Sequence, residues 1–402
     1  MRISFARAGV AAACALLAAT ISLTPGVAHA AAGGTLTTGT YANAAGELKY
    51  QLFVPSSYQP GTSVPLVVGL HGCTQTSDKF RLLSRLDELA AERNFIVVYP
   101  EQPSSSNRLG CWNWYTAAHV SRDAGEPSLI AGITRTVQQA YGADAKRTFV
   151  TGLSAGGAMA TVMGVTYPDL YAAVGVGSGC EYTGGAACAG YKSDDPELAG
   201  KRAYDAMGAY ARVMPFIVFQ GDEDKTVPPV NADQLVRSQQ VASDYADDGS
   251  KNGSIPQKAV KTTTGRKQGG RQYTTRLYSD GKGHELGQYW TVHGMAHAWS
   301  GGSADQQYSD PAGPDESAAM YDFFLKHPLG EPGPPLGGGG TTPGIPGAPQ
   351  PSWPIPEWPP PGAPGLPQLP GMPGLPQLPG MPQLPGMPQL PGLPGWPKPS
   401  RG

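Results

Sequence analysis

The chain has 402 residues, a formal net charge of −2, 15% charged residues and 40% hydrophobic residues. It contains no block of Lys and Arg, and this argues against a nucleic-acid partner because phosphate binding requires clustered basic side chains. No apolar stretch is long enough for a comfortable membrane span, so we expect no spanning segment.

The first thirty residues are typical of an export signal. Arg2 and Arg7 give a basic start, residues 10–23 form an apolar run, and residues 28–30 have the small-residue pattern of a cleavage site. Together they predict a signal peptide over residues 1–30 and a secreted, extracellular protein whose mature chain begins near Ala31. The alternative is an N-terminal anchor that is retained.

The use of cysteine agrees with export. Cys14 lies in the expected signal peptide, which leaves Cys73, Cys111, Cys180 and Cys188. An even number of cysteines in an exported chain suggests two disulfides, and three pairings are possible. Cys180 and Cys188 are close in sequence and would close one loop, which leaves Cys73 to pair with Cys111. No C-x-x-C motif occurs, so a redox or zinc-ribbon site has little support.

Strand-like and helix-like segments alternate along the middle of the chain. Strands are expected at residues 48–54, 64–70, 95–99, 148–151, 172–177 and 215–220, and a later pair at 271–280 and 286–294. Helices are expected at residues 80–94, 129–141, 155–167 and 315–326. This alternation predicts one α/β domain over residues 31–327, with a doubly wound, mostly parallel sheet covered by helices on both faces.

The composition changes completely at about Pro328. Residues 328–402 are rich in short Pro/Gly repeats with no heptad or alternating pattern. Frequent proline removes backbone donors and fixes φ, so we expect an extended, disordered tail. This tail is expected to act as a spacer or to contact the cell envelope.

Ser154 lies where an expected strand turns into a helix, in the stretch "TGLSAGGAMA". Gly152 stands two residues before it and Gly156 two residues after it. A side chain in so abrupt a turn is held in strained backbone geometry, and its neighbours must be small. The pattern G-x-S-x-G is that of a nucleophile elbow, although glycine and serine also form ordinary turns. Ser154 is therefore a candidate nucleophile.

Candidate acids and bases follow two other strands. Asp222 and Asp224 come after the strand at residues 215–220, and a later Gly-rich loop carries His293 and His297. Such strand ends are where doubly wound sheets bind ligands, and the order Ser, Asp, His is that of a hydrolase triad. Both aspartates could instead be solvated turn residues. His297 is preferred over His293 because it lies at the far side of its loop, where it could reach back over the elbow.

A triad needs each of these residue types. A serine hydroxyl is a poor nucleophile at neutral pH, so an imidazole must take its proton and a carboxylate must orient the imidazole. The loop "LHGCTQ" at residues 70–75 directly follows a buried strand. In this architecture it supplies one backbone N–H of the oxyanion hole, and the residue after the nucleophile supplies the other. Cys73 and Ala155 are the predicted donors.

Five motifs, "LHGCTQ", "CWNWY", "GLSAGGAMA", "GDEDKTVPP" and "GMAHAWSGG", occur in this order and spacing. Together they resemble the secreted polyhydroxyalkanoate depolymerase family of esterases, whose relatives include feruloyl and acetylxylan esterases. The resemblance covers nearly all of residues 40–327 and implies an α/β-hydrolase fold with a Ser-His-Asp triad. The family's aspartate pattern falls on Asp224, between Gly221 and Val227. The predicted catalytic residues are therefore Ser154, Asp224 and His297.

The chain departs from the family in two places. Gln220 stands where relatives often carry histidine, and we expect no effect on the chemistry. Many polymer depolymerases also carry a linker and a separate binding domain, whereas this chain has Pro/Gly repeats. The second difference puts efficient attack on solid polymer in doubt.

Four aromatic residues are expected to bind substrate at the rim of the site: Trp112, Trp114, Tyr115 and Trp299. The alternative is packing in the core, which is expected for one tryptophan. The stretch "HELGQ" lacks the second histidine of a zinc peptidase, and "GVGSGC" is not a dinucleotide fingerprint. We therefore expect no metal and no cofactor.

The sequence predicts a serine esterase that hydrolyses short-chain polyhydroxyalkanoate polyester or its oligomers through an acyl-enzyme on Ser154. Within the same chemistry, the alternative is an esterase acting on feruloyl or acetyl groups of plant polysaccharides. An alternative of another class is a catalytically idle cell-envelope protein. The expected partner is an ester substrate, and polymeric esters are included.

Overall fold

The computed structural model describes residues 29–31, 33–191 and 195–336. The chain divides into two units, residues 1–339 and 340–402, and every described residue belongs to the first. Nearly all of the expected signal peptide and most of the Pro/Gly-rich tail lie outside the described residues.

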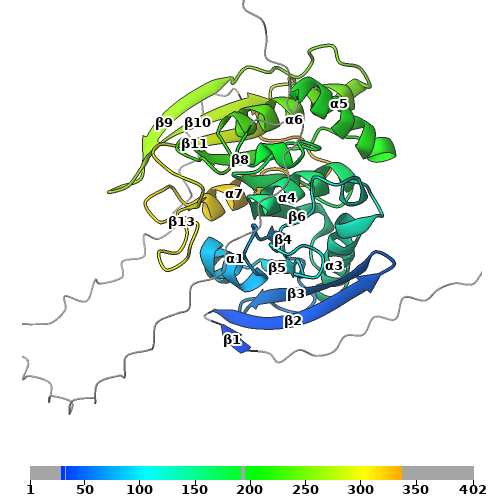
Figure 1. The fold of residues 1–402 in the computed structure, drawn as a ribbon, viewed down its shortest axis with the longest axis vertical. Coiled ribbons are helices and arrows are strands. Elements are labelled where there is room, and N and C mark those ends of the chain that lie inside the picture. Colours follow the sequence, from blue (N-terminus) through cyan, green and yellow to red (C-terminus); the bar gives the residue numbers. More distant parts are fainter. Residues whose placement is uncertain (1–28, 32, 192–194, 337–402) are drawn as a thin grey trace, which may run out of the picture. The chain divides into compact units, whose positions relative to one another are not determined.

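The described residues form an eleven-stranded sheet in the order β1-β2-β3-β5-β4-β6-β7-β8-β11-β10-β9 (Figure 1). Its strands are β1 (His29–Ala31), β2 (Gly34–Asn43), β3 (Gly46–Pro55), β4 (Leu66–Leu70), β5 (Ile96–Glu101), β6 (Thr148–Leu153), β7 (Val174–Gly177), β8 (Phe216–Gly221), β9 (Lys261–Arg266), β10 (Gln272–Ser279) and β11 (Glu285–Val292). The central run from β5 to β11 is parallel, and antiparallel strands flank it on both sides. β12 (Trp299–Ser300) and β13 (Ser309–Asp310) form a separate pair.

Helices cover both faces of this sheet. They are α1 (Ser77–Ser84), α2 (Leu86–Arg93), α3 (Gly125–Tyr141), α4 (Ala155–Thr166), α5 (Pro196–Met207), α6 (Val230–Asp248) and α7 (Glu316–Leu325). Side chains of α1, α2 and α7 build one hydrophobic core, and side chains of α3 to α6 build the other. Neighbouring strand residues alternate between the two cores, with Val67 in one and Val68 in the other, as the period of a strand requires. The doubly wound α/β architecture expected from the sequence is therefore present.

The single helix expected at residues 80–94 is wrong, because the chain forms two short helices there. Arg85 separates α1 from α2 and has a left-handed backbone with φ 58°. Its N–H donates to the carbonyl oxygen of Arg81 and so ends α1. Arginine is an ordinary helix former, so its residue type did not signal this break.

The described fold continues past residue 327. Leu329 N donates to Lys146 O at 2.8 Å, and Leu336 N donates to Gly283 O at 2.6 Å. The start of the Pro-rich stretch is therefore hydrogen-bonded to the α/β unit as far as Leu336.

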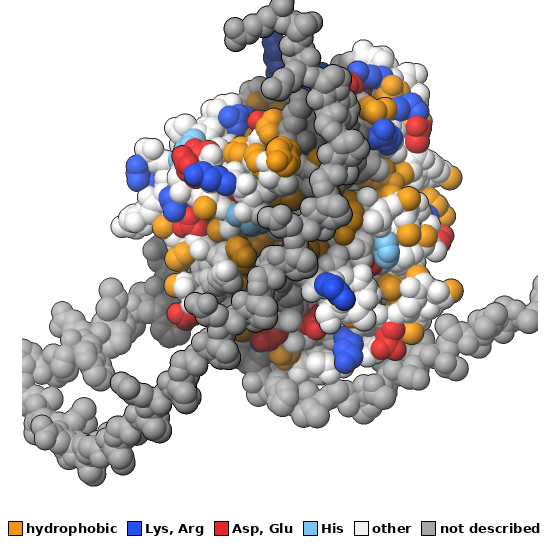
Figure 2. All heavy atoms as spheres, in the orientation of Figure 1, with side chains coloured by type: hydrophobic (Ala, Val, Ile, Leu, Met, Phe, Trp, Pro, Cys, Tyr) orange, Lys and Arg blue, Asp and Glu red, His pale blue; other side chains and the backbone are white. Residues whose placement is uncertain are grey.

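Acidic and basic side chains are mixed over the face of the molecule seen in Figure 2. None of the helices that the structure describes combines the length and the apolar character needed to cross a bilayer.

Candidate active site

Ser154 lies in a sharp elbow between β6 and α4. Its backbone has φ 60° and ψ −120°, a conformation that costs a non-glycine residue about 1–3 kcal/mol. The two flanking glycines make this turn possible. A Cβ atom at Gly156 would lie 2.0 Å from the carbonyl oxygen of Leu70, and one at Gly152 would lie 2.5 Å from the carbonyl carbon of Gly156. The strained turn therefore holds Ser154 at a fixed place, where it lines a cavity.

Asp224 lies in the loop after β8, and its side chain is fully buried. Oδ1 accepts hydrogen bonds from the N–H groups of Thr226 and Val227, both at 2.9 Å. Oδ2 accepts from Gln220 Nε2 at 3.1 Å and lies 2.7 Å from His297 Nδ1. Burial raises the pKa of Asp224, but the hydrogen bonds, led by that of His297, lower this pKa by more and hold it below its usual value. Asp224 is therefore an ionised carboxylate at neutral pH.

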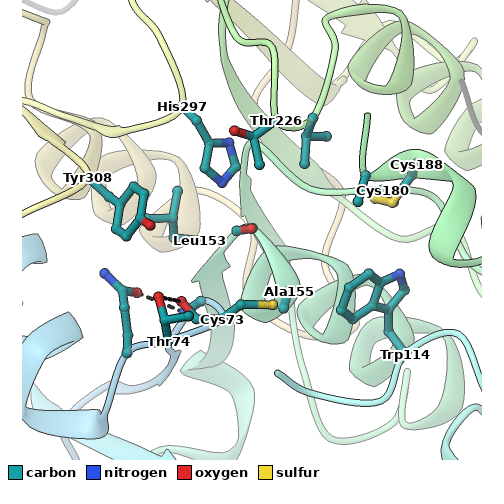
Figure 3. Close-up of a pocket in the computed structure, with 15 residues that line it drawn as sticks. Cys73, Thr74, Trp114, Leu153, Ala155, Cys180, Cys188, Thr226, His297 and Tyr308 are labelled. Atoms are coloured by element: carbon teal, nitrogen blue, oxygen red, sulfur yellow. Dashed lines mark hydrogen bonds between the residues drawn. A yellow bond between two sulfur atoms is a disulfide. The ribbon is translucent and has the colours of Figure 1, made fainter. Parts of the chain in front are cut away.

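His297 follows β11 and lines a cavity together with Ser154 (Figure 3). Its contact with the Asp224 carboxylate requires a proton on Nδ1, so Nε2 is the unprotonated acceptor of the neutral ring. Among the described residues, no partner occupies Nε2, and no hydrogen bond yet joins it to the Ser154 hydroxyl. In structures without substrate such catalytic hydrogen bonds are often long or incomplete.

Cys73 and Ala155 line the same cavity as Ser154. Within the described ranges, neither of their backbone N–H groups donates to a protein acceptor. The loop that carries Cys73 is held at the adjacent residue, since Gly72 N donates to Gln75 Oε1 at 2.8 Å. Both predicted oxyanion donors are therefore unpaired at the wall of the cavity.

His71 supports the oxyanion loop and was missed by the sequence analysis. Its ring is fully buried, and Nε2 accepts a hydrogen bond from Gln102 N at 3.0 Å. Nδ1 must then carry the proton, which it donates to Gly72 O at 2.8 Å. Burial lowers the pKa of His71, so the ring stays neutral and keeps this pattern. The loop sequence placed His71 two residues before Cys73, but its partner Gln102 is distant in sequence.

The four cysteines form the pairs Cys73–Cys111 and Cys180–Cys188, as expected from the sequence. Cys73, Cys180 and Cys188 all line the cavity. The first disulfide joins the oxyanion loop to the segment that carries Trp114. Both disulfides are therefore part of the wall around Ser154 as well as covalent links.

Of the four aromatic residues expected at the rim, only Trp114 lines the cavity. Tyr115 is 40% exposed and packs edge-on against Trp114, with ring centroids 5.0 Å apart. Trp112 and Trp299 are fully buried and donate their indole N–H groups to His71 O and Ser317 Oγ. The alternative of core packing, expected for one tryptophan, therefore applies to two.

The cavity has a volume of about 170 Å³ and a mainly apolar lining. Figure 3 shows Tyr308 on one side and Trp114 with the Cys180–Cys188 disulfide on the opposite side. The sequence analysis missed several lining residues: Thr74, Gln75, Leu153, Ala189, Thr226, Val227 and Tyr308. Tyr308, whose ring is 6.1 Å from that of His297, lies in an irregular loop with no motif that could have marked it.

Asp222 and His293, the candidates passed over, form a pair of their own. His293 Nδ1 lies 2.8 Å from Asp222 Oδ2, and His293 Nε2 lies 2.8 Å from Thr274 Oγ1. Their side chains are 37% and 42% exposed, and neither lines the cavity. Nowhere in the described part do three or more His, Cys, Asp or Glu side chains gather as a metal site would require.

Comparison with known proteins adds independent information. The model of the family described as Esterase PHB depolymerase matches residues 48–253. Poly(3-hydroxyalkanoate) depolymerase C of Paucimonas lemoignei is 31% identical over 260 residues, which cover 63% of this chain and 58% of the relative. Acetylxylan esterase A of Talaromyces purpureogenus is 34% identical over 209 residues, which cover 48% of this chain and 53% of the relative.

Among solved structures, the acetyl xylan esterase from Aspergillus awamori matches with a TM-score of 0.53 and 26% identity. The match covers 62% of this chain and 89% of that chain. With the strand order above, it identifies an α/β-hydrolase fold. The chain spans a little over half the length of the two curated relatives.

Proposed function

The chain belongs to the family of PHB depolymerase esterases, and from this premise we propose that it is a serine hydrolase of carboxylic esters. Ser154 is the nucleophile, His297 the general base and acid, and Asp224 the carboxylate that orients His297. The observation that carries the proposal is the buried Asp224–His297 pair, whose His297 lines the same cavity as the strained Ser154.

Acylation begins with attack of Ser154 Oγ on the carbonyl carbon of the ester. The hydroxyl proton moves to His297 Nε2 as the new C–O bond forms, and the electron pair of the carbonyl moves onto its oxygen. The backbone N–H groups of Cys73 and Ala155 stabilise this oxyanion. Loss of one such donor typically costs about a hundredfold or more in rate.

Acylation is complete when the tetrahedral intermediate collapses, and deacylation by water follows. The bond to the alkoxy group breaks, and this group leaves as an alcohol with the proton from His297 Nε2. Water then attacks the acyl-Ser154 ester and gives a proton to the same nitrogen, which returns it to Ser154 Oγ as the acid departs. Asp224 remains ionised throughout and stabilises the imidazolium.

The small, mainly apolar cavity supports a short acyl group. The candidate substrates are a short-chain hydroxyalkanoate polyester or its oligomers, as for the Paucimonas lemoignei relative, and acetylated carbohydrate, as for the Talaromyces purpureogenus relative. Two disulfides support an oxidising, extracellular location. An idle envelope protein is disfavoured, because it has no need for an aligned acid, base and strained serine.

The test is a substrate panel combined with Ser154→Ala. The wild-type protein should hydrolyse p-nitrophenyl acetate and lose activity as the acyl chain lengthens, and a phosphonate should label Ser154. The Ser154→Ala protein should keep its circular dichroism spectrum and lose turnover and labelling. Substantial turnover by the folded variant would refute the mechanism.

A further inference from the structure

A second, polar hollow adjoins the active-site cavity. It has a volume of about 440 Å³ and is called the trough below. It is lined by Glu47, Lys49, Thr74, Gln75, Thr76, Glu101, Gln102, Pro103, Ser104, Arg108, Leu109 and Gly110. Thr74 and Gln75 also line the cavity that contains Ser154. These two residues therefore form a shared boundary between the cavity at Ser154 and the trough.

The hollow surface continues beyond the trough. Lys49 and Glu101 also line a further depression of about 370 Å³ over β2 and β3. The trough and this depression together offer more space than a single short ester needs.

The trough carries equal numbers of positive and negative side chains. Glu47 and Glu101 face Lys49 and Arg108 around one hollow, two charges of each sign. Among the described residues, the side chains of Glu47, Lys49 and Arg108 have no hydrogen-bond or ion-pair partner. Glu101 Oε2 accepts from Ser77 N at 3.1 Å and Ser77 Oγ at 2.5 Å, whereas Oε1 has no described partner. The trough therefore offers unpaired donors and unpaired acceptors together.

The wall shared with the cavity is fixed in place. Thr74 has a left-handed backbone with φ 63°. Its N–H donates to Leu109 O, and its hydroxyl donates to Cys73 O, both at 2.6 Å. These bonds join the edge of the trough to the loop that carries Cys73.

The chemistry of the lining distinguishes two kinds of chain. A polyester of hydroxyalkanoates carries ester oxygens, which only accept hydrogen bonds, separated by apolar groups. Against such a chain, the carboxylates of Glu47 and Glu101 would lose water without gaining a donor, which is unfavourable. A carbohydrate chain carries hydroxyl groups that both donate and accept, so it satisfies the carboxylates and the cations alike.

We propose that the trough is a binding subsite for a hydroxyl-rich carbohydrate chain that bears the scissile ester. This inference rests on the proposed esterase function and names the substrate class of the same site. Lys49 and Arg108 donate to hydroxyl oxygens of the chain, and Glu47 and Glu101 accept from its hydroxyl groups. The short acyl group occupies the cavity at Ser154.

The experiment compares Lys49→Ala and Arg108→Ala with a matched control, Arg266→Ala, an exposed arginine on β9 outside both hollows. The substrates are p-nitrophenyl acetate, a partially acetylated xylo-oligosaccharide and a 3-hydroxybutyrate trimer. Each trough variant should lower the ratio of kcat/KM for the oligosaccharide to kcat/KM for p-nitrophenyl acetate by about threefold to tenfold, mainly through KM. The control should keep the wild-type ratio.

Binding provides a readout that does not depend on turnover. The Ser154→Ala protein should bind the acetylated oligosaccharide in a calorimeter, and adding Lys49→Ala should weaken that binding by a similar factor. Absence of binding, unchanged ratios in both trough variants, or an equal loss on the trimer would overturn the trough assignment. A wild-type protein that binds the oligosaccharide but fails on p-nitrophenyl acetate would refute the esterase function and leave the subsite standing.

Discussion

Two Asp–His pairs join the same two loops. They have similar contact distances but differ in burial and in the partner of the histidine Nε2. Asp224–His297 and Asp222–His293 have Oδ2 to Nδ1 distances of 2.7 and 2.8 Å. The side chains of the first pair are 0% and 9% exposed, and those of the second are 37% and 42% exposed. His297 has a free Nε2 on the cavity, whereas Nε2 of His293 is hydrogen-bonded to Thr274.

Under the proposed mechanism, this difference separates a contact that can serve catalysis from one that only links two loops. A buried carboxylate with several donors holds its charge and its geometry, and an unoccupied Nε2 can take a proton from Ser154. An exposed pair competes with water, contributes about 0–1 kcal/mol of stability and fixes loops more than it drives chemistry. The four residues are nearly indistinguishable in the sequence, and only their surroundings separate them.

The largest expected difference is between the two histidines. His297→Ala should lower kcat/KM for p-nitrophenyl acetate by about ten-thousandfold or more, because it removes the acceptor of the Ser154 proton. His293→Ala should stay within about threefold of the wild type, as for surface substitutions away from a site. Steady-state kinetics on folded proteins measures both, and an inactive His293→Ala protein would reverse the assignment.

Substitutions of the two aspartates should differ nearly as widely in their effect on kcat. Asp224→Asn should lower kcat by about a thousandfold to ten-thousandfold, because an amide no longer stabilises the imidazolium or fixes its tautomer. Asp222→Asn should again remain within about threefold. Equal losses in the two variants would mean that both pairs position the base loop, and the comparison above would fail.

Gln220 tests the comparison on a smaller scale, since among the described residues no side-chain amide donates a hydrogen bond to Asp222. Its Nε2 donates to Asp224 Oδ2 and to Val227 O, and its side chain is buried. Gln220→Leu should lower kcat about threefold to tenfold with little change in KM, because it loosens Asp224 without touching substrate. Gln272→Leu, on the exposed surface of β10, is the matched control and should match the wild type in kcat. A rise in KM alone would contradict this positioning role.

The smallest effect concerns stability in acid. The pKa of Asp224 is lowered in the folded state, so its contribution is complete above the unfolded value of about 3.9 and is lost as pH falls through the lower folded value. The melting temperature of the wild type should therefore fall more steeply below about pH 4 than that of Asp224→Asn. The Asp222→Asn protein keeps Asp224 and should retain the wild-type slope. Parallel curves for wild type and Asp224→Asn would contradict the assigned pKa shift.

Local patterns predicted the framework and the elbow that carries the candidate nucleophile. The elbow at Ser154 could be anticipated because its requirement for small neighbours is met within a few residues. Hydrophobic periodicity located the strands of the parallel centre of the sheet, whereas β2, β9, α5 and α6 were not anticipated. Choosing Asp224 over Asp222 needed the family resemblance, since local chemistry allowed either.

The orientation of side chains and the contacts between residues distant in sequence could not be predicted. The aromatic-rich stretch after Cys111 does not reveal that Trp112 turns into the core while Trp114 reaches the cavity. The hydrogen bond from Gln220 to Asp224 was not anticipated, because it forms only once the loop closes around Gln220. Tyr308 reaches the cavity through an irregular loop, whose path no periodicity encodes.

The left-handed backbone at Ser154 implies a trade-off between stability and activity: the strain lowers the stability of the fold, and the proposed reaction needs the serine. Glycine tolerates φ 60° and ψ −120° far better than serine, so Ser154→Gly should relieve strain and raise the melting temperature while abolishing turnover. A laboratory selection for heat resistance alone would favour that inactive variant. If natural lineages keep serine at this position, selection for activity must maintain it. Without that selection, substitution by glycine would be favoured.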